Sequence, residues 1–516
     1  MFALLVLVAA AGVVCGPLFG GEGPVVTTGD GALRGALGPV AHVASFKGIP
    51  FAAPPVGELR WREPQPVQPW RGIRDATGFG PSSIQRMHGD YLPWTREFLA
   101  QGEVSEDCLY LNVWAPRAEG RASLPVVVFI HGGAFLEGSG DVPVYDGTRL
   151  AAKGLVVVTL NYRLGVLGFF SHPELTAESP HHASGNYGLM DQIAALRWVR
   201  GNIAAFGGDP ARVTVWGQSA GAASVGALLS SPLARGLFQR AMADSGLGAG
   251  GRPVRDLGAA ERLGAAFAAS HKAASLKDLR ALPAAEFVGS NGFGLVVDGW
   301  VLPETPDAIN LGGGGSDVPV ITGTQKDDGP LAHPKLGSIE AYGDFVQRTF
   351  GAQAARFMQL YPASDAGAIQ GALKDAGRDR ERVASFLWAT AREATHRSRA
   401  YTYYFVRAIP WPQHPEFGAF HTGEIPYFFG NLGLLDRPWE PVDRELSGTA
   451  SGYLERFAEN GDPNGQDLPK WPAANAATRL TQQIGEDTRA IAVADPGKYA
   501  FWAEQLRPGR EAKAGN

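Results

Sequence analysis

The pattern that most constrains the fold is an alternation of short apolar runs with helix-like segments along most of the chain. Each run is apolar at successive positions, so both of its faces would be buried, as in a central strand covered by helices on both sides. The runs occupy residues 125–130, 155–160, 213–217, 318–322 and 401–406. Strand, helix and strand repeated in this way predict an α/β protein with an open, mainly parallel sheet.

The segment between the second and third runs has the period of an amphipathic helix. Its apolar side chains recur at steps of three or four positions, which places them on one stripe of a helix. These side chains are Leu189, Ile193, Leu196, Val199, Ile203 and Phe206. The segment therefore predicts a long helix that packs against the sheet.

Composition excludes several classes of protein. The 516 residues allow one large domain or several smaller ones, and 45% hydrophobic with 19% charged residues supply enough apolar surface for a large core. The net charge is -5, with no long basic run, so nucleic acid is not expected as a partner. The sequence does not indicate an oligomeric state.

The N-terminus predicts export. Residues 2–14 form an apolar run that is too short to span a membrane but has the length of a signal-peptide core. The region before it lacks Lys and Arg, and cleavage points after Gly12 and Cys15 compete. We expect residues 1–20 to be a signal peptide and the mature protein to be secreted or periplasmic, without a stable membrane span. The alternative is an N-terminal apolar strand or core segment.

The first chemical motif is Gly217-Gln218-Ser219-Ala220-Gly221. It follows the strand predicted at 213–217 and precedes a helix-compatible run at 222–229, which is the context of a nucleophile elbow. In such an elbow the serine lies on a strained turn with its hydroxyl exposed, and small neighbours prevent backbone collisions. The alternative is an ordinary turn from strand to helix.

A second motif, His131-Gly132-Gly133-Ala134-Phe135, follows the strand predicted at 125–130. Small residues allow backbone N–H groups to approach a reacting carbonyl, and the amide after the elbow serine could add a further donor. A plain glycine turn is the alternative. Two such motifs, each directly after a predicted strand, favour acyl-transfer chemistry.

These motifs stand among blocks that resemble the type-B carboxylesterases and cholinesterases. The blocks run through nearly the whole mature chain and are FKGIPFA at 46–52, EDCLYLNV at 106–113, NYRLG at 161–165, GNYGLMDQ at 185–192 and FGGDP at 206–210. The resemblance implies the α/β-hydrolase fold: a large, mostly parallel sheet flanked by helices, with helical insertions forming a gorge. It also implies that residues 21–516 form a single domain.

The resemblance also implies a catalytic triad in the order serine, acid, histidine. Ser219 would be the nucleophile, and His421, in the motif FHTGE at 420–424, would be the base. Asp328 takes the place of the usual glutamate after the strand at 318–322, and its shorter side chain requires the loop to move inward. Its neighbour Asp327 is the alternative acid, for which a loop-capping role is expected.

The resemblance assigns the oxyanion hole to the backbone amides of Gly133, Ala134 and Ala220, with Gly132 needed for the turn. Ser245, in the motif DSG, matches a serine that supports the acid.

One departure from the family concerns cysteine. The chain has two cysteines, Cys15 and Cys108, which excludes a disulfide scaffold and a cysteine-based zinc site. In relatives Cys108 pairs with an upstream cysteine, but here Ser83 fills that place, so this disulfide is absent. The loop between residues 83 and 108, which contributes to the gorge wall in relatives, must then be held by packing.

The sequence therefore predicts a serine carboxylesterase that hydrolyses an uncharged ester of modest size without a metal or organic cofactor. We expect its gorge to be lined by apolar and aromatic residues from insertions between the acid and the histidine. An amidase, or a hydrolase of carbamates or xenobiotic esters, would use the same triad and remains an alternative. A non-catalytic binding protein is disfavoured because all three triad positions are filled, and neither a lipase lid nor a choline-binding aromatic residue is recognisable.

Overall fold

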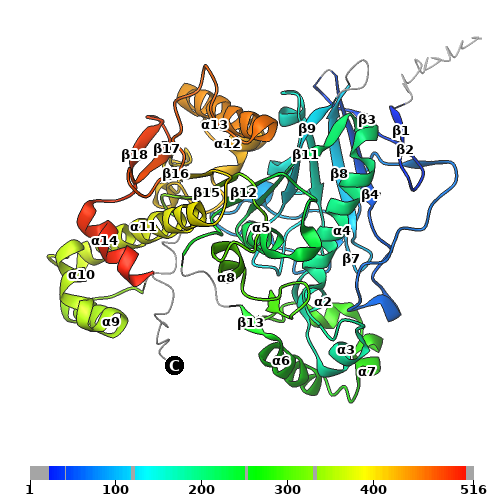
Figure 1. The fold of residues 1–516 in the computed structure, drawn as a ribbon, viewed down its shortest axis with the longest axis horizontal. Coiled ribbons are helices and arrows are strands. Elements are labelled where there is room, and N and C mark those ends of the chain that lie inside the picture. Colours follow the sequence, from blue (N-terminus) through cyan, green and yellow to red (C-terminus); the bar gives the residue numbers. More distant parts are fainter. Residues whose placement is uncertain (1–22, 41, 118–122, 250–253, 329–333, 507–516) are drawn as a thin grey trace, which may run out of the picture.

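A computed structural model describes residues 23–40, 42–117, 123–249, 254–328 and 334–506. The predicted signal peptide at 1–20 lies outside these residues. The centre of the molecule is an 11-stranded sheet (Figure 1). In spatial order its strands are β18 (Arg489–Ala492), β17 (Leu480–Ile484), β16 (Ala400–Phe405), β15 (Val320–Gln325), β12 (Arg240–Asp244), β11 (Gly208–Gln218), β9 (Leu124–Ile130), β10 (Val156–Leu160), β8 (Tyr110–Pro116), β4 (Val43–Pro50) and β3 (Ala36–Leu37).

The sheet is parallel in its middle and antiparallel at its edges. The strands from β17 through β16, β15, β12, β11 and β9 to β10 are parallel. β8, β4 and β3 on one side and β18 on the other pair antiparallel. The mainly parallel sheet predicted from the apolar runs is confirmed, and each run predicted as a strand overlaps a strand of this sheet. Small sheets lie outside it: β1 (Val25–Thr27) with β2 (Ala32–Arg34) and β5 (Ile73–Asp75), β6 (Ser82–Ser83) with β7 (Val104–Ser105), and β13 (Arg255–Asp256) with β14 (Val296–Val297).

Both faces of the central sheet are buried by helices, as β9 illustrates. Its alternate side chains Val126, Val128 and Ile130 belong to the core that contains the apolar stripe of α4 (Tyr187–Asn202), whereas Val127 and Phe129 belong to the core on the opposite face. Side chains of a strand alternate between faces, so a run that is apolar at successive positions must be covered on both sides. This packing explains why the central strands carry no polar face.

The helices fall into groups that cover different parts of the sheet (Figure 1). α4 (Tyr187–Asn202), which was predicted from its periodicity, and α5 (Ala220–Ser230) pack near β11 with α8 (Pro306–Leu311). α12 (Ile425–Phe429) and α13 (Pro441–Asn460) pack together, and α11 (Ala366–Ala391) packs on β15, β16 and α14 (Pro496–Gln505). The remaining α-helices are α1 (Thr148–Ala151), α2 (Gly165–Phe169), α3 (Pro173–Glu178), α6 (Leu257–Ser270), α7 (Leu276–Ala281), α9 (Ile339–Phe350) and α10 (Ala354–Leu360).

The predicted site residues follow the carboxyl ends of neighbouring parallel strands. The glycine motif follows β9, the elbow serine follows β11, the two aspartates follow β15, and His421 lies beyond β16. The carboxyl ends of parallel strands lie at one edge of a sheet, where ligands bind in open α/β folds. Within the described residues, no helix is long and apolar enough to cross a membrane.

Candidate active site

The turn at Ser219 has the geometry of a nucleophile elbow. β11 ends at Gln218 and α5 begins at Ala220, so Ser219 alone makes the turn, with φ 59° and ψ −118°. This backbone conformation is strained for a residue with a side chain. A Cβ on Gly217 would lie 2.3 Å from the Gly221 carbonyl oxygen, and a Cβ on Gly221 would lie 2.0 Å from the Ile130 carbonyl oxygen. The close approach of backbone to backbone therefore requires both flanking glycines.

The Ser219 hydroxyl is not used to stabilise the helix that it precedes. Its side chain makes no cap bond to α5, while its backbone N–H donates to the Asp244 carbonyl at 2.8 Å. The first amides of an α-helix have no partner within the helix, and they favour negative charge at this end. The Ala220 amide therefore lies in the first turn of α5, beside the serine, where it can serve as an oxyanion donor.

The glycine motif after β9 lies against the elbow. A Cβ on Gly132 would lie 3.0 Å from the Ser219 Cβ, so the two turns are in direct contact. Gly133 has φ +98°, and a Cβ there would lie 2.1 Å from the Glu137 carbonyl oxygen; Ala134 also has positive φ, 56°. The turn therefore brings the Gly133 and Ala134 backbone next to the serine, as an oxyanion hole requires.

His131, the first residue of the motif, is buried and helps to hold this turn. Its ring is 1% exposed, stacks on Tyr162 with ring centroids 4.5 Å apart, and lies with Nδ1 2.9 Å from the Gly132 carbonyl oxygen. Tyr162 in turn donates its hydroxyl to the His131 carbonyl at 3.0 Å. Burial lowers the His131 pKa to about 4, so this histidine is neutral near pH 7 and holds the turn in place.

His421 and Asp328 are in contact although they lie far apart in the sequence. His421 Nδ1 is hydrogen bonded to Asp328 Oδ1, and the other carboxylate oxygen of Asp328 accepts from Thr324 Oγ1 at 2.5 Å. Burial alone would raise the pKa of Asp328, but the charge and hydrogen bond of His421, with the hydroxyls of Thr324 and Ser245, lower it below its usual value. Asp328 is therefore ionised at neutral pH. Ser245 also donates to Gln325 Oε1 at 2.6 Å.

The neighbouring Asp327 points elsewhere. Its carboxylate forms an ion pair with Arg378 at 2.5 Å and accepts a hydrogen bond from the Ala419 amide at 3.0 Å. It thus ties the loop that carries His421 to α11 and makes no hydrogen bond to the histidine ring. The structure places Asp328, and not Asp327, against His421, and it gives Asp327 the kind of loop role expected from the sequence.

The other ring nitrogen of His421 faces the elbow. Because Nδ1 faces a carboxylate, the proton belongs on Nδ1, and Nε2 is left to accept a hydrogen bond. Nε2 lies 3.1 Å from the side-chain nitrogen of Gln218, the residue before Ser219. Trp94 fixes the backbone behind the ring: its indole N–H lies 3.2 Å from the His421 carbonyl and 2.7 Å from Thr422 Oγ1. Neither Gln218 nor Trp94 was assigned a role from the sequence.

Ser219 and His421 line one open cavity of about 290 Å³. Its wall includes the aromatic side chains of Tyr91, Trp94, Phe98 and Tyr145, together with Gly132, Gly133 and Ala134. The expectation that insertions between the acid and the histidine line the cavity is wrong for the residues described. The wall comes from residues 85–100 and 132–145, because α11 packs against β15, β16 and α14 instead.

The loop between residues 83 and 108 is held in place without a disulfide at Cys108. Cys108 is the free cysteine of the described chain; it is fully buried, and burial raises its pKa well above the usual value. Ser83 lies beside it, forms a side-chain hydrogen bond with it, and also accepts from the Leu164 amide at 3.1 Å. Gln85 makes reciprocal bonds with the Gly138 backbone at 2.9 and 2.7 Å. Hydrogen bonds therefore tie the cavity wall to the oxyanion turn.

Comparison with known proteins fits this geometry. The model of the carboxylesterase family matches residues 22–502. The chain belongs to the carboxylesterase family. It is 37% identical to the para-nitrobenzyl esterase of Bacillus subtilis (strain 168) over 483 residues, which cover 89% of this chain and 94% of the relative. It is also 37% identical to fumonisin B1 esterase of Sphingopyxis macrogoltabida (86% and 83% covered) and 34% identical to human cocaine esterase (87% and 86% covered).

Solved structures of carboxylesterases share the fold. A PNB esterase structure superposes with a TM-score of 0.79 and 33% identity, covering 94% of this chain and 99% of that one. A thermophilic PNB esterase gives a TM-score of 0.78 at 33% identity, with 93% and 99% covered. The α/β-hydrolase fold expected from the sequence is therefore confirmed, and the protein is a carboxylic ester hydrolase.

Two buried carboxyl groups of this carboxylesterase, on Glu424 and Asp244, interact electrostatically with Asp328. Glu424 is 0% exposed, and neither of its carboxyl oxygens has a hydrogen-bond partner among the described residues. Asp244, also 0% exposed, accepts from Trp216 Nε1 at 2.5 Å. Burial raises the pKa of both groups, and repulsion from Asp328 adds to it; repulsion from Asp244 further raises the pKa of Glu424, whereas hydrogen bonds from Trp216 and Tyr403 partly offset the rise for Asp244. Glu424 therefore holds its proton to a higher pH than an exposed glutamate, whereas the nearby Asp328 loses its proton more readily than an exposed aspartate.

Glu424→Gln should make stability less dependent on pH. An exposed glutamate ionises near pH 4.3, so above this pH the unfolded chain releases a proton that folded Glu424, with its raised pKa, still holds. Stability from this group is complete below the unfolded pKa and is lost as pH rises toward the folded pKa, at up to about 1.4 kcal/mol per pH unit. Urea unfolding at several pH values should show that the free energy of unfolding decreases less with rising pH in Glu424→Gln than in the wild type. Equal slopes of the free energy of unfolding against pH in the two proteins would contradict a raised pKa for Glu424.

Proposed function

We propose that this carboxylesterase hydrolyses esters through a covalent acyl-enzyme on Ser219, with His421 as general base and Asp328 as the acid that orients it. The observation that carries the proposal is the arrangement of His421: Nδ1 contacts the Asp328 carboxylate, while Nε2 faces Gln218, the residue directly before Ser219 in the elbow. An imidazole held in this way has its basic nitrogen directed toward the nucleophile.

The first half of the reaction forms the acyl-enzyme. Nε2 of His421 leaves the Gln218 amide and takes the Ser219 hydroxyl proton as Oγ attacks the ester carbonyl carbon. The carbonyl oxygen becomes an oxyanion that accepts hydrogen bonds from the amides of Gly133, Ala134 and Ala220, and each such donor lowers the barrier by about 3 kcal/mol. The carbon–oxygen bond to the alcohol then breaks, and His421 returns the proton to the departing alkoxide. Asp328 stabilises the imidazolium that exists between these transfers.

The second half repeats these steps with water. His421 removes a proton from water, the hydroxide attacks the acyl carbon, and collapse of the second tetrahedral intermediate releases the carboxylic acid and regenerates Ser219. These steps need no metal or organic cofactor. The Asp328 carboxylate must remain ionised throughout, which its lowered pKa supports.

Hydrolysis of 4-nitrophenyl acetate and butyrate tests the proposal, with 4-nitroanilides of the same acids as the competing amide substrates. We expect both esters to be hydrolysed and the anilides to react at least about 100-fold more slowly, because an amine is a poorer leaving group than a phenol. Esters varied separately in acyl and alcohol length then define the two sides of the cavity. Faster turnover of the anilides would favour the amidase alternative, and no ester turnover would contradict the proposal.

We also propose that residues 1–20 direct export and are removed, leaving residues 21–516 as one catalytic domain in a secreted or periplasmic enzyme. The apolar run at 2–14 supports this proposal. N-terminal sequencing of the protein from its native host tests it: a mature start between residues 13 and 21 is expected, and retention of Met1 would contradict it.

A further inference from the structure

A second cavity adjoins the catalytic one. It has a volume of about 160 Å³ and shares Gln85, Arg86, His88 and Glu137 with the cavity that contains Ser219. The two spaces therefore meet along one wall formed by residues 85–88 and the segment after the oxyanion turn. A substrate whose ester group lies at Ser219 could extend past this wall into the second cavity.

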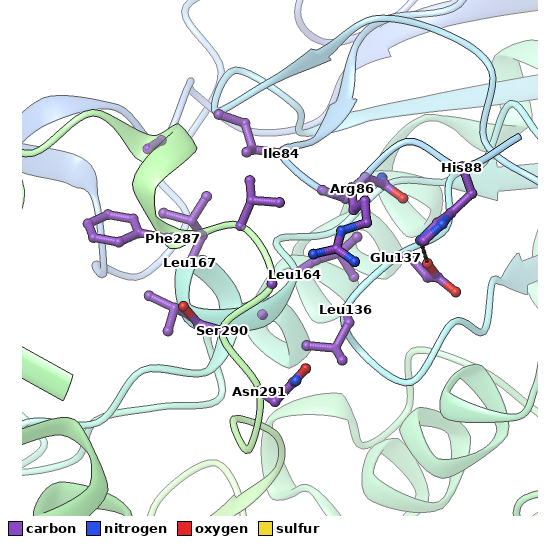
Figure 2. A pocket seen from close by; sticks show the side chains of 16 residues that line it. Ile84, Arg86, His88, Leu136, Glu137, Leu164, Leu167, Phe287, Ser290 and Asn291 are labelled. Atoms are coloured by element: carbon purple, nitrogen blue, oxygen red, sulfur yellow. Dashed lines mark ion pairs between the residues drawn. The ribbon is translucent and has the colours of Figure 1, made fainter. Parts of the chain in front are cut away.

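The lining of the second cavity combines apolar and polar side chains in similar measure. Ile84, Leu136, Leu164, Leu167 and Phe287 supply aliphatic and aromatic surface (Figure 2). Ser290 and Asn291 add hydrogen-bonding side chains. Apolar surface can bury part of a ligand, and the polar groups can orient it.

Arg86 is a solvent-exposed cation without an ionic partner among the described residues, and it lies at the junction of the two cavities. Within the described part of the chain, its guanidinium makes no hydrogen bond or ion pair, although it is the only arginine among the residues that line either cavity. The one acidic residue in the two linings, Glu137, is engaged by His88 Nε2 at 3.0 Å, shown by the dashed line in Figure 2. Arg86 therefore remains available to a ligand.

The position of the Arg86 guanidinium also suits ligand binding in the cavity. Figure 2 shows it directed toward the cavity, and a Cβ built on Gly289 would lie 3.4 Å from its terminal nitrogen. Gly289 has φ +81°, a conformation that side chains rarely adopt, so the position next to the guanidinium is kept open. Arginine presents several N–H donors in a planar fork that matches the two oxygens of a carboxylate.

We propose that Arg86 binds a carboxylate of the substrate, so that the preferred substrates of this carboxylesterase are esters that carry a negatively charged group several bonds from the ester carbonyl. This inference rests on the proposed function and refines it, replacing the uncharged ester expected from the sequence. The carboxylate lies at the wall shared by the two cavities, and the apolar part of the substrate packs against the leucines of the second cavity.

Two matched pairs of substrates test the proposal. The first pair places the charge on the acyl side, mono-4-nitrophenyl adipate against 4-nitrophenyl hexanoate. The second places it on the alcohol side, 4-(butyryloxy)benzoate against phenyl butyrate. In at least one pair we expect Arg86→Gln to lower kcat/KM for the charged ester about tenfold, mainly through KM, while the neutral ester changes less than twofold. Arg86→Lys should retain part of the preference, because it keeps the charge without the fork.

Arg200→Gln is the matched control, because it removes an exposed arginine from α4 that lines neither cavity. It should leave the ratio of kcat/KM for the charged ester to kcat/KM for the neutral ester unchanged. The proposal is overturned if Arg86→Gln leaves this ratio unchanged in both pairs, or if it slows charged and neutral esters equally. Failure of the proposed function would look different, since the wild-type protein would then hydrolyse none of the four esters.

Discussion

Ser219→Ala should reduce kcat for 4-nitrophenyl butyrate by about 10⁶-fold while leaving the fold intact. The alanine removes the only atom that forms the acyl bond, and loss of the nucleophile in serine hydrolases has an effect of this size. Because the Ser219 hydroxyl does not cap α5, its removal costs the helix no hydrogen bond. The melting temperature should therefore change by less than about 2 °C.

Initial-rate kinetics and thermal unfolding of the same preparation measure both effects. Ser364→Ala, at an exposed serine outside the cavity lining, is the control and should retain full activity. Turnover by Ser219→Ala within tenfold of the wild type would contradict the assignment of the nucleophile. A large decrease in the melting temperature would instead show that the elbow depends on the hydroxyl.

Asp328→Asn should lower kcat by about 10⁴-fold, and Asp327→Asn by less than tenfold. An asparagine in place of Asp328 keeps the shape of the side chain but removes the charge that stabilises the imidazolium, and it favours the wrong histidine tautomer. Asp327 contacts Arg378 and the Ala419 amide instead, so its substitution should mainly lower stability, by about 1 kcal/mol.

The two aspartates are adjacent in the sequence and undergo the same chemical change, so each variant serves as the control for the other. Steady-state kinetics separates their effects on activity, and urea unfolding separates their effects on stability. A greater loss of kcat in Asp327→Asn than in Asp328→Asn would contradict the assignment of the acid.

The strands of the sheet could be predicted from the sequence because a strand buried on both faces is apolar at successive positions. The strands β9, β10 and β16 coincide with apolar runs to within one residue, since nearly every position of these strands packs against a helix or a neighbouring strand. β15 begins two residues later than predicted, at Val320, because Pro319 has no N–H to donate to a neighbouring strand. The elbow was also predictable, since Gly217 and Gly221 are required by backbone contacts that any such turn creates.

The surroundings of the triad were harder to predict because they depend on contacts between distant segments. Trp94 lies 327 positions from the His421 carbonyl that it contacts, and no local pattern marks this pair. The choice between Asp327 and Asp328 depended on side-chain direction, which adjacent residues of the same type do not reveal. Glu424 stood inside the histidine motif, but its burial without a hydrogen-bond partner among the described residues became evident only from the packing around it.

Intact-protein mass spectrometry after rapid acid quenching of a reaction with 4-nitrophenyl butyrate can detect a covalent acyl-enzyme on Ser219. We expect a species heavier than the free enzyme by one butyryl group, mapped by peptide fragmentation to Ser219 and absent from Ser219→Ala. We also expect this species to accumulate in a variant slow in deacylation. A butyryl group found on another residue, or an equal amount of acyl-enzyme in Ser219→Ala, would contradict the proposed acyl-enzyme on Ser219.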